Sequence, residues 1–156
     1  MARVQLALNV ANLDEAIGFY SKLFAIGPAK VRPGYANFAI AEPPLKLVLV
    51  EDATQKGGSL NHLGVEVASP EEVTAAQARL AAAGMATAIE DQVSCCYAVQ
   101  DKVWVSGPDG EPWEVYTVLA DTEMPAGELR TTDPGGAVCC ATGPGIAGQA
   151  TASPCC

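Results

Sequence analysis

Three side chains far apart in the sequence could together hold one divalent cation. They are Gln5, Glu114 and His62, which is the single histidine of the chain. An imidazole nitrogen with a carboxylate and an amide oxygen suits a borderline or hard metal. The set approximates the two-histidine, one-carboxylate site of non-haem Fe(II) oxygenases, with glutamine replacing one histidine. Three protein ligands leave coordination positions open for substrate and O2, as catalysis requires.

Each of these residues also has an ordinary structural explanation. A lone histidine is more often structural than a metal ligand, Gln5 alone could be a solvated strand residue, and Glu114 alone an exposed strand acid. The metal interpretation therefore depends on whether the fold brings the three together.

The six cysteines form three adjacent pairs, Cys95-Cys96, Cys139-Cys140 and Cys155-Cys156. Adjacent cysteines rarely bond to each other because the small ring is strained. The N-terminal sequence has no signal peptide, which predicts a cytoplasmic protein with reduced thiols. Paired thiolates favour thiophilic centres such as Cd(II), Cu(I) or trivalent arsenic. Joint chelation at Cys95-Cys96 needs a turn there, and the alternative is two small buried neighbours.

Composition limits the class of protein. The chain has 156 residues, enough for one domain, and 49% of them are hydrophobic. A net charge of −9 disfavours nucleic acid as a partner, and no apolar run approaches the length of a membrane span. We expect a small-molecule substrate, in a protein that is either a monomer or a homodimer.

An internal repeat organises the chain. Residues 4–27 and 61–84 each contain an alternating strand, a helix start and a closing glycine. Asn12 with Glu15, and Ser69 with Glu72, have capping-box spacing. The offset between the copies places Gln5 and His62 at equivalent positions.

Short strand candidates follow each helix, at 29–32, 36–40 and 45–50 in the first copy and at 87–90, 102–106 and 113–119 in the second. The pattern predicts an α+β fold of two βαβββ modules, roughly residues 1–52 and 59–119, in one domain of residues 1–119. Their sheets, related by a pseudo-twofold axis, should curl into a partly open barrel around the metal site. Residues 120–156 have no aromatic residue and are rich in Gly, Pro, Ala and Thr, which predicts a flexible tail.

Strand alternation assigns the predicted ligands to one face. Gln5 lies opposite the Val4, Leu6, Leu8 and Val10 face, which should pack under the helix. His62 takes the equivalent face of the second copy, and Glu114 shares a side with Tyr116. The pattern predicts Lys46 as the first-copy counterpart of Glu114, which favours three ligands over four.

The chain resembles the glyoxalase, bleomycin-resistance and extradiol dioxygenase superfamily, also called the vicinal oxygen chelate superfamily, in its NHLGVEV and GPDGEPWEVY segments. More narrowly, GYANFAI, PPLKLVL and CCYAVQDKVWV resemble the organoarsenical carbon–arsenic lyases and the related cadmium-induced proteins. This resemblance covers roughly residues 2–123.

The resemblance implies an Fe(II)-dependent dioxygenase that uses O2 to release arsenite from methylarsenite or trivalent aromatic arsenicals. By position, Gln5, His62 and Glu114 would hold Fe(II), for which Ni, Co, Mn or Zn could substitute in a crystal, and Cys95 with Cys96 would hold the arsenic. Residues 93–100 form a candidate lid. Candidates to line the substrate pocket, for some of which core packing is the alternative, are Phe38, Tyr97, Lys102, Trp104 and Tyr116.

Two other functions stay open at this point. Three cysteine pairs would also suit a protein that sequesters cadmium or arsenite without turnover. A glyoxalase-type isomerase is the third possibility, although it requires four protein ligands.

Overall fold

The computed structural model describes residues 2–95 and 97–123 and contains the two βαβββ modules in succession. The predicted order of strands and helices is confirmed. The first module consists of β1 (Arg3–Val10), α1 (Leu13–Phe24), β2 (Lys30–Arg32), β3 (Tyr35–Ile40) and β4 (Leu45–Glu51). The second consists of β5 (Leu60–Glu66), α2 (Pro70–Ala82), β6 (Thr87–Cys95), β7 (Ala98–Ser106) and β8 (Pro112–Asp121).

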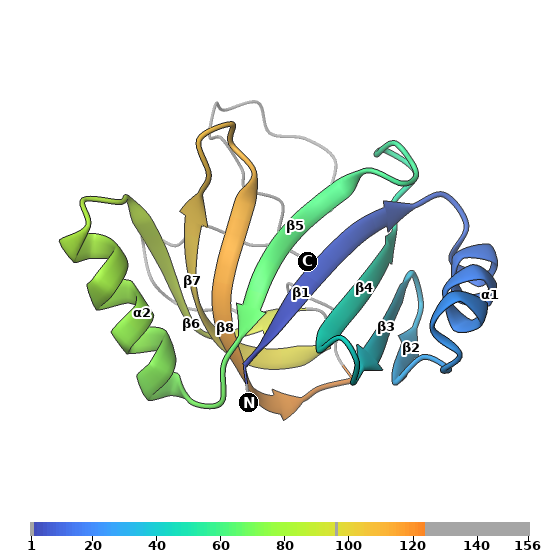
Figure 1. Ribbon diagram of the computed structural model, residues 1–156, viewed down its shortest axis with the longest axis horizontal. Helices are drawn as coiled ribbons and strands as arrows, with labels where there is room; N and C mark the ends of the chain where they lie inside the picture. Colours follow the sequence, from blue (N-terminus) through green and yellow to red (C-terminus); the bar gives the residue numbers. More distant parts are fainter. Residues whose placement is uncertain (1, 96, 124–156) are drawn as a thin grey trace.

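All eight strands belong to one sheet, with the order β2-β3-β4-β1-β5-β8-β7-β6. The sheets of the two modules are halves of this one sheet, because β1 pairs antiparallel with β5, and the predicted curled, partly open barrel is confirmed. Parallel pairs flank that junction, β1 with β4 and β5 with β8. Figure 1 shows the resulting sheet curled into an open half-barrel, with one helix on the outside at each end.

Each helix covers the outer face of its own module. Leu13 of α1 belongs to a core cluster with Val10 and Leu47, against which Leu6 and Leu8 also pack. This confirms the face predicted for β1, except that Val4, at its start, is 47% exposed. Neither helix in the described part of the chain is long and apolar enough to cross a membrane.

The two helix starts differ from each other. The Asn12 side chain accepts a hydrogen bond from the Glu15 backbone N–H at 3.0 Å, as the sequence predicts. Ser69 makes no such bond, so the second predicted cap is wrong. Glu72 reaches past Ser69 and accepts from the Ala68 N–H at 3.2 Å instead.

The strands β6 and β7 are longer than predicted and form a hairpin whose tip follows Cys95. Polar residues at 90–92 hide the alternation of β6, and the register shifts between Glu90 and Val93. Cys95 pairs with Ala98, and Tyr97 between them has a φ of 61°, so the chain reverses there as thiol chelation requires.

Contacts between the tip and β2 draw the two edges of the sheet together. The Tyr97 hydroxyl donates to the Pro33 carbonyl at 3.2 Å, and the Lys30 ammonium reaches the Tyr97 carbonyl at 3.3 Å. Strand β8 continues to Asp121, two residues beyond the predicted end of the domain, and Asp121 forms an ion pair with Lys30. Residues 124–156 of the predicted tail, with both of its cysteine pairs, lie outside the described residues.

Phe38 packs in the core beneath α1, with Leu13 and Leu47, and is fully buried there. It was a candidate for the substrate pocket, and this prediction is wrong because its strand face points toward the helix.

We therefore expect Phe38→Leu to lower the free energy of unfolding by about 1.5 kcal/mol through imperfect repacking. Affinity for a divalent metal should stay within about twofold of wild type, because the core lies on the other face of the sheet. Urea denaturation and metal titration measure the two effects. If Phe38→Leu lowered the metal affinity as well as the stability, Phe38 would have to be assigned to the substrate pocket after all.

Candidate metal centre

Three neighbouring strands at the middle of the sheet bring Gln5, His62 and Glu114 together. The Gln5 Nε2 atom lies 2.9 Å from His62 Nε2 and 2.7 Å from Glu114 Oε1. His62 Nε2 and Glu114 Oε1 are 3.3 Å apart. All three residues are buried, with exposed fractions of 4% or less. The convergence expected from strand alternation is thus present in the fold.

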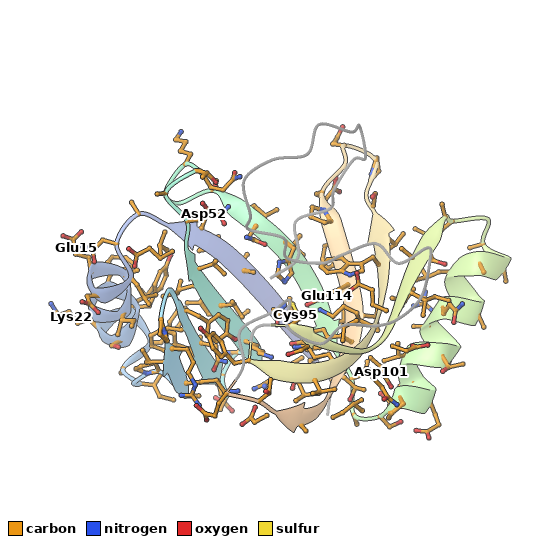
Figure 2. The ribbon with its side chains drawn as sticks, turned by 180° about the vertical axis from the view of Figure 1, so that it is seen from behind. Glu15, Lys22, Asp52, Cys95, Asp101 and Glu114 are labelled. Carbon is orange, nitrogen blue, oxygen red and sulfur yellow. The ribbon has the colours of Figure 1, made fainter. Side chains whose placement is uncertain are left out.

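The three side chains line an enclosed cavity on the concave side of the sheet, where Figure 2 shows Cys95 and Glu114. Its volume of about 10 Å³ is the room that one water or ion occupies. The cavity is lined by Gln5, Tyr35, Lys46, Val48, His62, Cys95, Gln100, Lys102 and Glu114.

The Lys102 ammonium fixes the charge of Glu114. Its Nζ atom lies 2.9 Å from Glu114 Oε2, and both side chains are almost fully buried. Burial alone would raise the pKa of Glu114, but the Lys102 charge, with contributions from His62, lowers it to about 2. Glu114 is therefore a carboxylate, and Lys102 on its outer oxygen leaves Oε1 facing His62 and Gln5.

A chain of side-chain amides orients the His62 ring. Asn61 Nδ2 donates to Asn9 Oδ1 at 2.8 Å, and Asn9 Nδ2 donates to Ser59 Oγ at 3.0 Å. Asn61 Oδ1 then faces His62 Nδ1 at 2.7 Å, so the ring proton belongs on Nδ1. The His62 Nε2 atom consequently presents a lone pair to the cavity, which a metal ligand needs.

The donor set fits a divalent metal ion. Glu114 Oε2 forms a 2.9 Å ion pair with Lys102, which leaves Oε1 as the carboxylate oxygen available to a cation. In the described part of the chain, no three His, Cys, Asp or Glu side chains are placed together so that they could hold a metal ion. The candidate centre instead combines His62 and Glu114 with the amide of Gln5, a residue type outside those four.

Strand register corrects the assignment of Lys46. Ala7 pairs with Val48 in the first module, and the equivalent Gly64 pairs with Glu114 in the second. The counterpart of Glu114 is therefore Val48, which carries no donor atom. The expectation of three protein ligands therefore depends on Val48 and not on Lys46. The Lys46 ammonium instead donates to the Tyr116 hydroxyl at 3.0 Å.

Cys95 is the one described member of the predicted thiol pair. It is 1% exposed and lines the cavity beside the three metal-type donors. It is disulfide-bonded, contrary to the expectation of reduced thiols. The other five cysteines, Cys96 included, lie outside the described residues, and so does the bonding partner.

Residues 3–115 match the model of the Glyoxalase/Bleomycin resistance protein/Dioxygenase superfamily. The chain belongs to this superfamily. It is 58% identical to the "Trivalent organoarsenical cleaving enzyme" of Thermomonospora curvata over the full length of both chains. It is also 59% identical to "Cadmium-induced protein CadI" of Mycobacterium tuberculosis H37Rv, over 90% of this chain and 93% of that one.

Solved structures of more distant members share the fold. The Mn(II)-bound glyoxalase from Novosphingobium aromaticivorans aligns with a TM-score of 0.56 at 21% identity, over 78% of this chain and 42% of that one. An extradiol ring-cleaving dioxygenase from B. fuscum aligns with a TM-score of 0.56 at 20% identity, over 78% and 34%. Both likenesses establish the superfamily fold of two modules around one concave face.

The remaining pocket candidates lie at or near the concave face of this superfamily fold. Trp104 meets the His62 ring edge-on, with centroids 5.5 Å apart. Tyr97 packs on Tyr35, with centroids 5.8 Å apart, at the tip of the β6–β7 hairpin. Lys102 lines the cavity, and Tyr116 lies within hydrogen-bond distance of Gln5.

Sequence reasoning missed the neighbours of the ligands. Asn61 adjoins His62 in the sequence, but it orients the His62 ring only because the Asn9 amide on the neighbouring strand holds it in place. Gly64 pairs with Gln5 on one side and with Glu114 on the other. Strand alternation places Gly64 on the same face as His62, and this was the signal that could have shown its position beside the candidate ligands.

Gly64→Ala should weaken metal binding by about tenfold or more. A Cβ atom at this position would meet Glu114 Cγ at 3.0 Å, so Glu114 must shift, and it would also contact Gln5 Cβ at 3.4 Å. Gly18→Ala is the control, because a Cβ at the α1 glycine meets no atom within 4 Å. Calorimetric titration with Co(II) compares the two variants, and equal affinities would contradict the tight packing of the site.

The lowered pKa of Glu114 predicts acid sensitivity of the metal-free protein. The pKa falls from an ordinary 4.5 to about 2 on folding. Its contribution to stability is therefore complete above about pH 4.5 and is lost as the pH falls toward 2. The full window corresponds to on the order of 3 kcal/mol.

Urea unfolding at about pH 5 and about pH 3 tests this linkage. We expect the free energy of unfolding to fall less in Glu114→Gln than in wild type. Equal losses in the two proteins would show that Glu114 titrates normally in the folded state.

Proposed function

We propose that the chain is an Fe(II)-dependent dioxygenase that cleaves the carbon–arsenic bond of trivalent organoarsenicals and releases arsenite. The observation that carries this proposal is that Cys95 and the three metal-type donors line one cavity. The 58% identity with the organoarsenical cleaving enzyme of T. curvata supports the choice of substrate.

Gln5, His62 and Glu114 would hold the metal at the junction of the modules. When bound, Fe(II) supplies the redox chemistry that lets O2 react with an organic group. Lys102 keeps Glu114 ionised and holds its outer oxygen, so that one carboxylate oxygen faces the cavity. Asn61 keeps the His62 proton away from the cavity.

Cys95 and Cys96 would capture the arsenic atom as a dithiolate and so orient its organic group toward the metal. The Cys95 disulfide must be reduced before this capture can occur. Gln100 is 5% exposed and lines the same cavity. Its Oε1 atom has no hydrogen-bond partner among the described residues, so it is a buried acceptor for a hydroxyl group on arsenic.

The cavity must open before an organoarsenical can enter. A volume of about 10 Å³ accommodates one small ion or water, and no organic substituent. The segment 93–100 supplies both Cys95 and Gln100 to the lining, and its tip rests on β2 through Tyr97. We therefore assign this segment as a lid that closes over captured substrate and excludes water.

The reaction balances without an external reductant. Methylarsenite and O2 together contain the same atoms as arsenite and formaldehyde. One oxygen atom ends on arsenic, which stays trivalent, and the other ends on the carbon. The carbon loses four electrons and O2 gains four, so the carbon–arsenic bond breaks oxidatively with O2 as the sole oxidant.

Sequestration without turnover is the second candidate. The identity of 59% with a cadmium-induced protein favours it, as does the placement of Cys95 at an enclosed cavity. A glyoxalase-type isomerase is disfavoured, because Val48 stands where a fourth ligand would be needed.

The proposal predicts arsenite and formaldehyde in equal amounts when reduced protein, loaded anaerobically with Fe(II), receives methylarsenite and then air. Cys95→Ser should reduce turnover by at least about 100-fold, because capture supplies the proximity of the reacting groups. Ser94→Ala, one residue away on the same strand, is the matched control and should turn over normally. Chromatographic arsenic speciation and a formaldehyde assay measure the products.

Stoichiometric arsenic binding by wild type without any product would establish sequestration. Normal turnover by Cys95→Ser would remove the capture role while leaving the metal centre in place.

A further inference from the structure

The Tyr116 hydroxyl lies between the metal centre and a charged cluster on the same face of the sheet. It is within hydrogen-bond distance of two acceptors, Gln5 Oε1 at 2.6 Å and Glu66 Oε2 at 2.8 Å. It also accepts a hydrogen bond from Lys46 Nζ at 3.0 Å. A hydroxyl group has one proton, so Tyr116 can donate to Gln5 or to Glu66 but not to both.

The Gln5 amide has two orientations of the same shape, related by a half-turn of its end group. In one orientation Gln5 Nε2 points inward, toward His62 and Glu114, and donates its two protons to His62 Nε2 and Glu114 Oε1. Gln5 Oε1 then points outward and accepts the Tyr116 proton. Every atom on the inner side then has a hydrogen-bond partner without any metal. This orientation therefore suits the empty centre.

With Oε1 directed toward His62 and Glu114, the neighbours of Tyr116 no longer compete for its proton. Gln5 Nε2 donates one proton to the Tyr116 oxygen, Lys46 donates to the same oxygen, and the Tyr116 proton goes to Glu66. A hydroxyl oxygen can accept two hydrogen bonds while donating one, so the Tyr116 hydroxyl uses its full capacity. The inner side then holds three lone-pair atoms from Gln5, His62 and Glu114, and their close approach requires a cation between them.

Charge favours the second arrangement once a cation is present. Glu66 is a carboxylate held by Lys46 Nζ at 3.1 Å and by Arg3 Nη2 at 2.9 Å. A hydrogen bond from Tyr116 to this carboxylate is stronger than one to a neutral amide oxygen. The outer cluster thus favours the orientation that directs the Gln5 oxygen toward the metal.

We propose that Tyr116 is a positioning residue for the metal centre, and that metal binding turns the Gln5 amide and redirects the Tyr116 proton from Gln5 to Glu66. This inference rests on the metal site of the proposed function. Replacing Tyr116 removes a neutral hydrogen bond from the empty state and a charge-assisted one from the loaded state, so the loaded state loses more.

Tyr116→Phe should weaken Co(II) binding by about tenfold, which is the lower end of the effect expected for a group behind a metal ligand. Tyr20→Phe on α1 is the matched control, since it removes the same hydroxyl outside the cluster. Anaerobic titration followed through the visible absorption of Co(II) gives the affinity and the ligand field. Thermal unfolding of both variants without metal gives the structural contribution.

Repeating the measurements in a Gln5→His protein distinguishes positioning of the Gln5 amide by Tyr116 from a general packing effect of the Tyr116 side chain. An imidazole ligand has no amide to turn, so Tyr116→Phe should change Co(II) affinity by less than about twofold there. Glu66→Gln keeps the Tyr116 hydroxyl but removes the carboxylate charge that accepts its proton. This variant should weaken Co(II) binding when residue 5 is glutamine and not when it is histidine. Equal losses in both backgrounds, or no loss from either variant, would overturn the inference. Failure of wild type itself to bind Co(II) would instead overturn the metal site of the proposed function.

Discussion

The pairing of β5 with β1 on one side and β8 on the other is the constraint on which the rest of the structure depends. It sets Gly64 between Gln5 and Glu114, and the missing side chain of the glycine is the space in which the two ligands meet. A slip of one residue in either pair would turn a ligand to the helical face of the sheet. The central strands therefore define the candidate metal centre, and the outer strands enclose it.

Burying such a polar centre requires that its charges be paired. The carboxylate of Glu114 has Lys102, and that of Glu66 has Lys46 and Arg3. Burial, together with the nearby carboxylates Glu66 and Glu114, raises the pKa of Tyr116 well above its ordinary value, so its hydroxyl keeps its proton and stays a donor. Lys46 in turn lowers the pKa of Glu66, against the opposing effect of burial. The centre is thus a network of fixed charges and donors, into which the β6–β7 tip brings the sulfur of Cys95.

The sequence was sufficient to predict the modules and the convergence of the three candidate ligands, because both follow from local periodicity. Equivalent positions in the repeat placed Gln5 and His62 on matching strands, and alternation placed Glu114 on the same face. The pairing of β1 with β5, which joins the modules, was not predicted because hydrogen bonding between these strands leaves no local pattern. The same reason explains Lys46, whose apparent equivalence to Glu114 fails by two residues once the register is known. Phe38 was misassigned because an aromatic residue in a strand fits either face.

The central claim is that an amide, an imidazole and a carboxylate hold the metal, while the thiols hold the substrate. X-ray absorption at the iron edge of reduced, Fe(II)-loaded protein tests this most directly. We expect a first shell of nitrogen and oxygen only, with the outer-shell scattering of one imidazole and no sulfur, unchanged in Cys95→Ser. A sulfur scatterer in the first shell, or a fully hydrated ion without imidazole, would contradict the assignment.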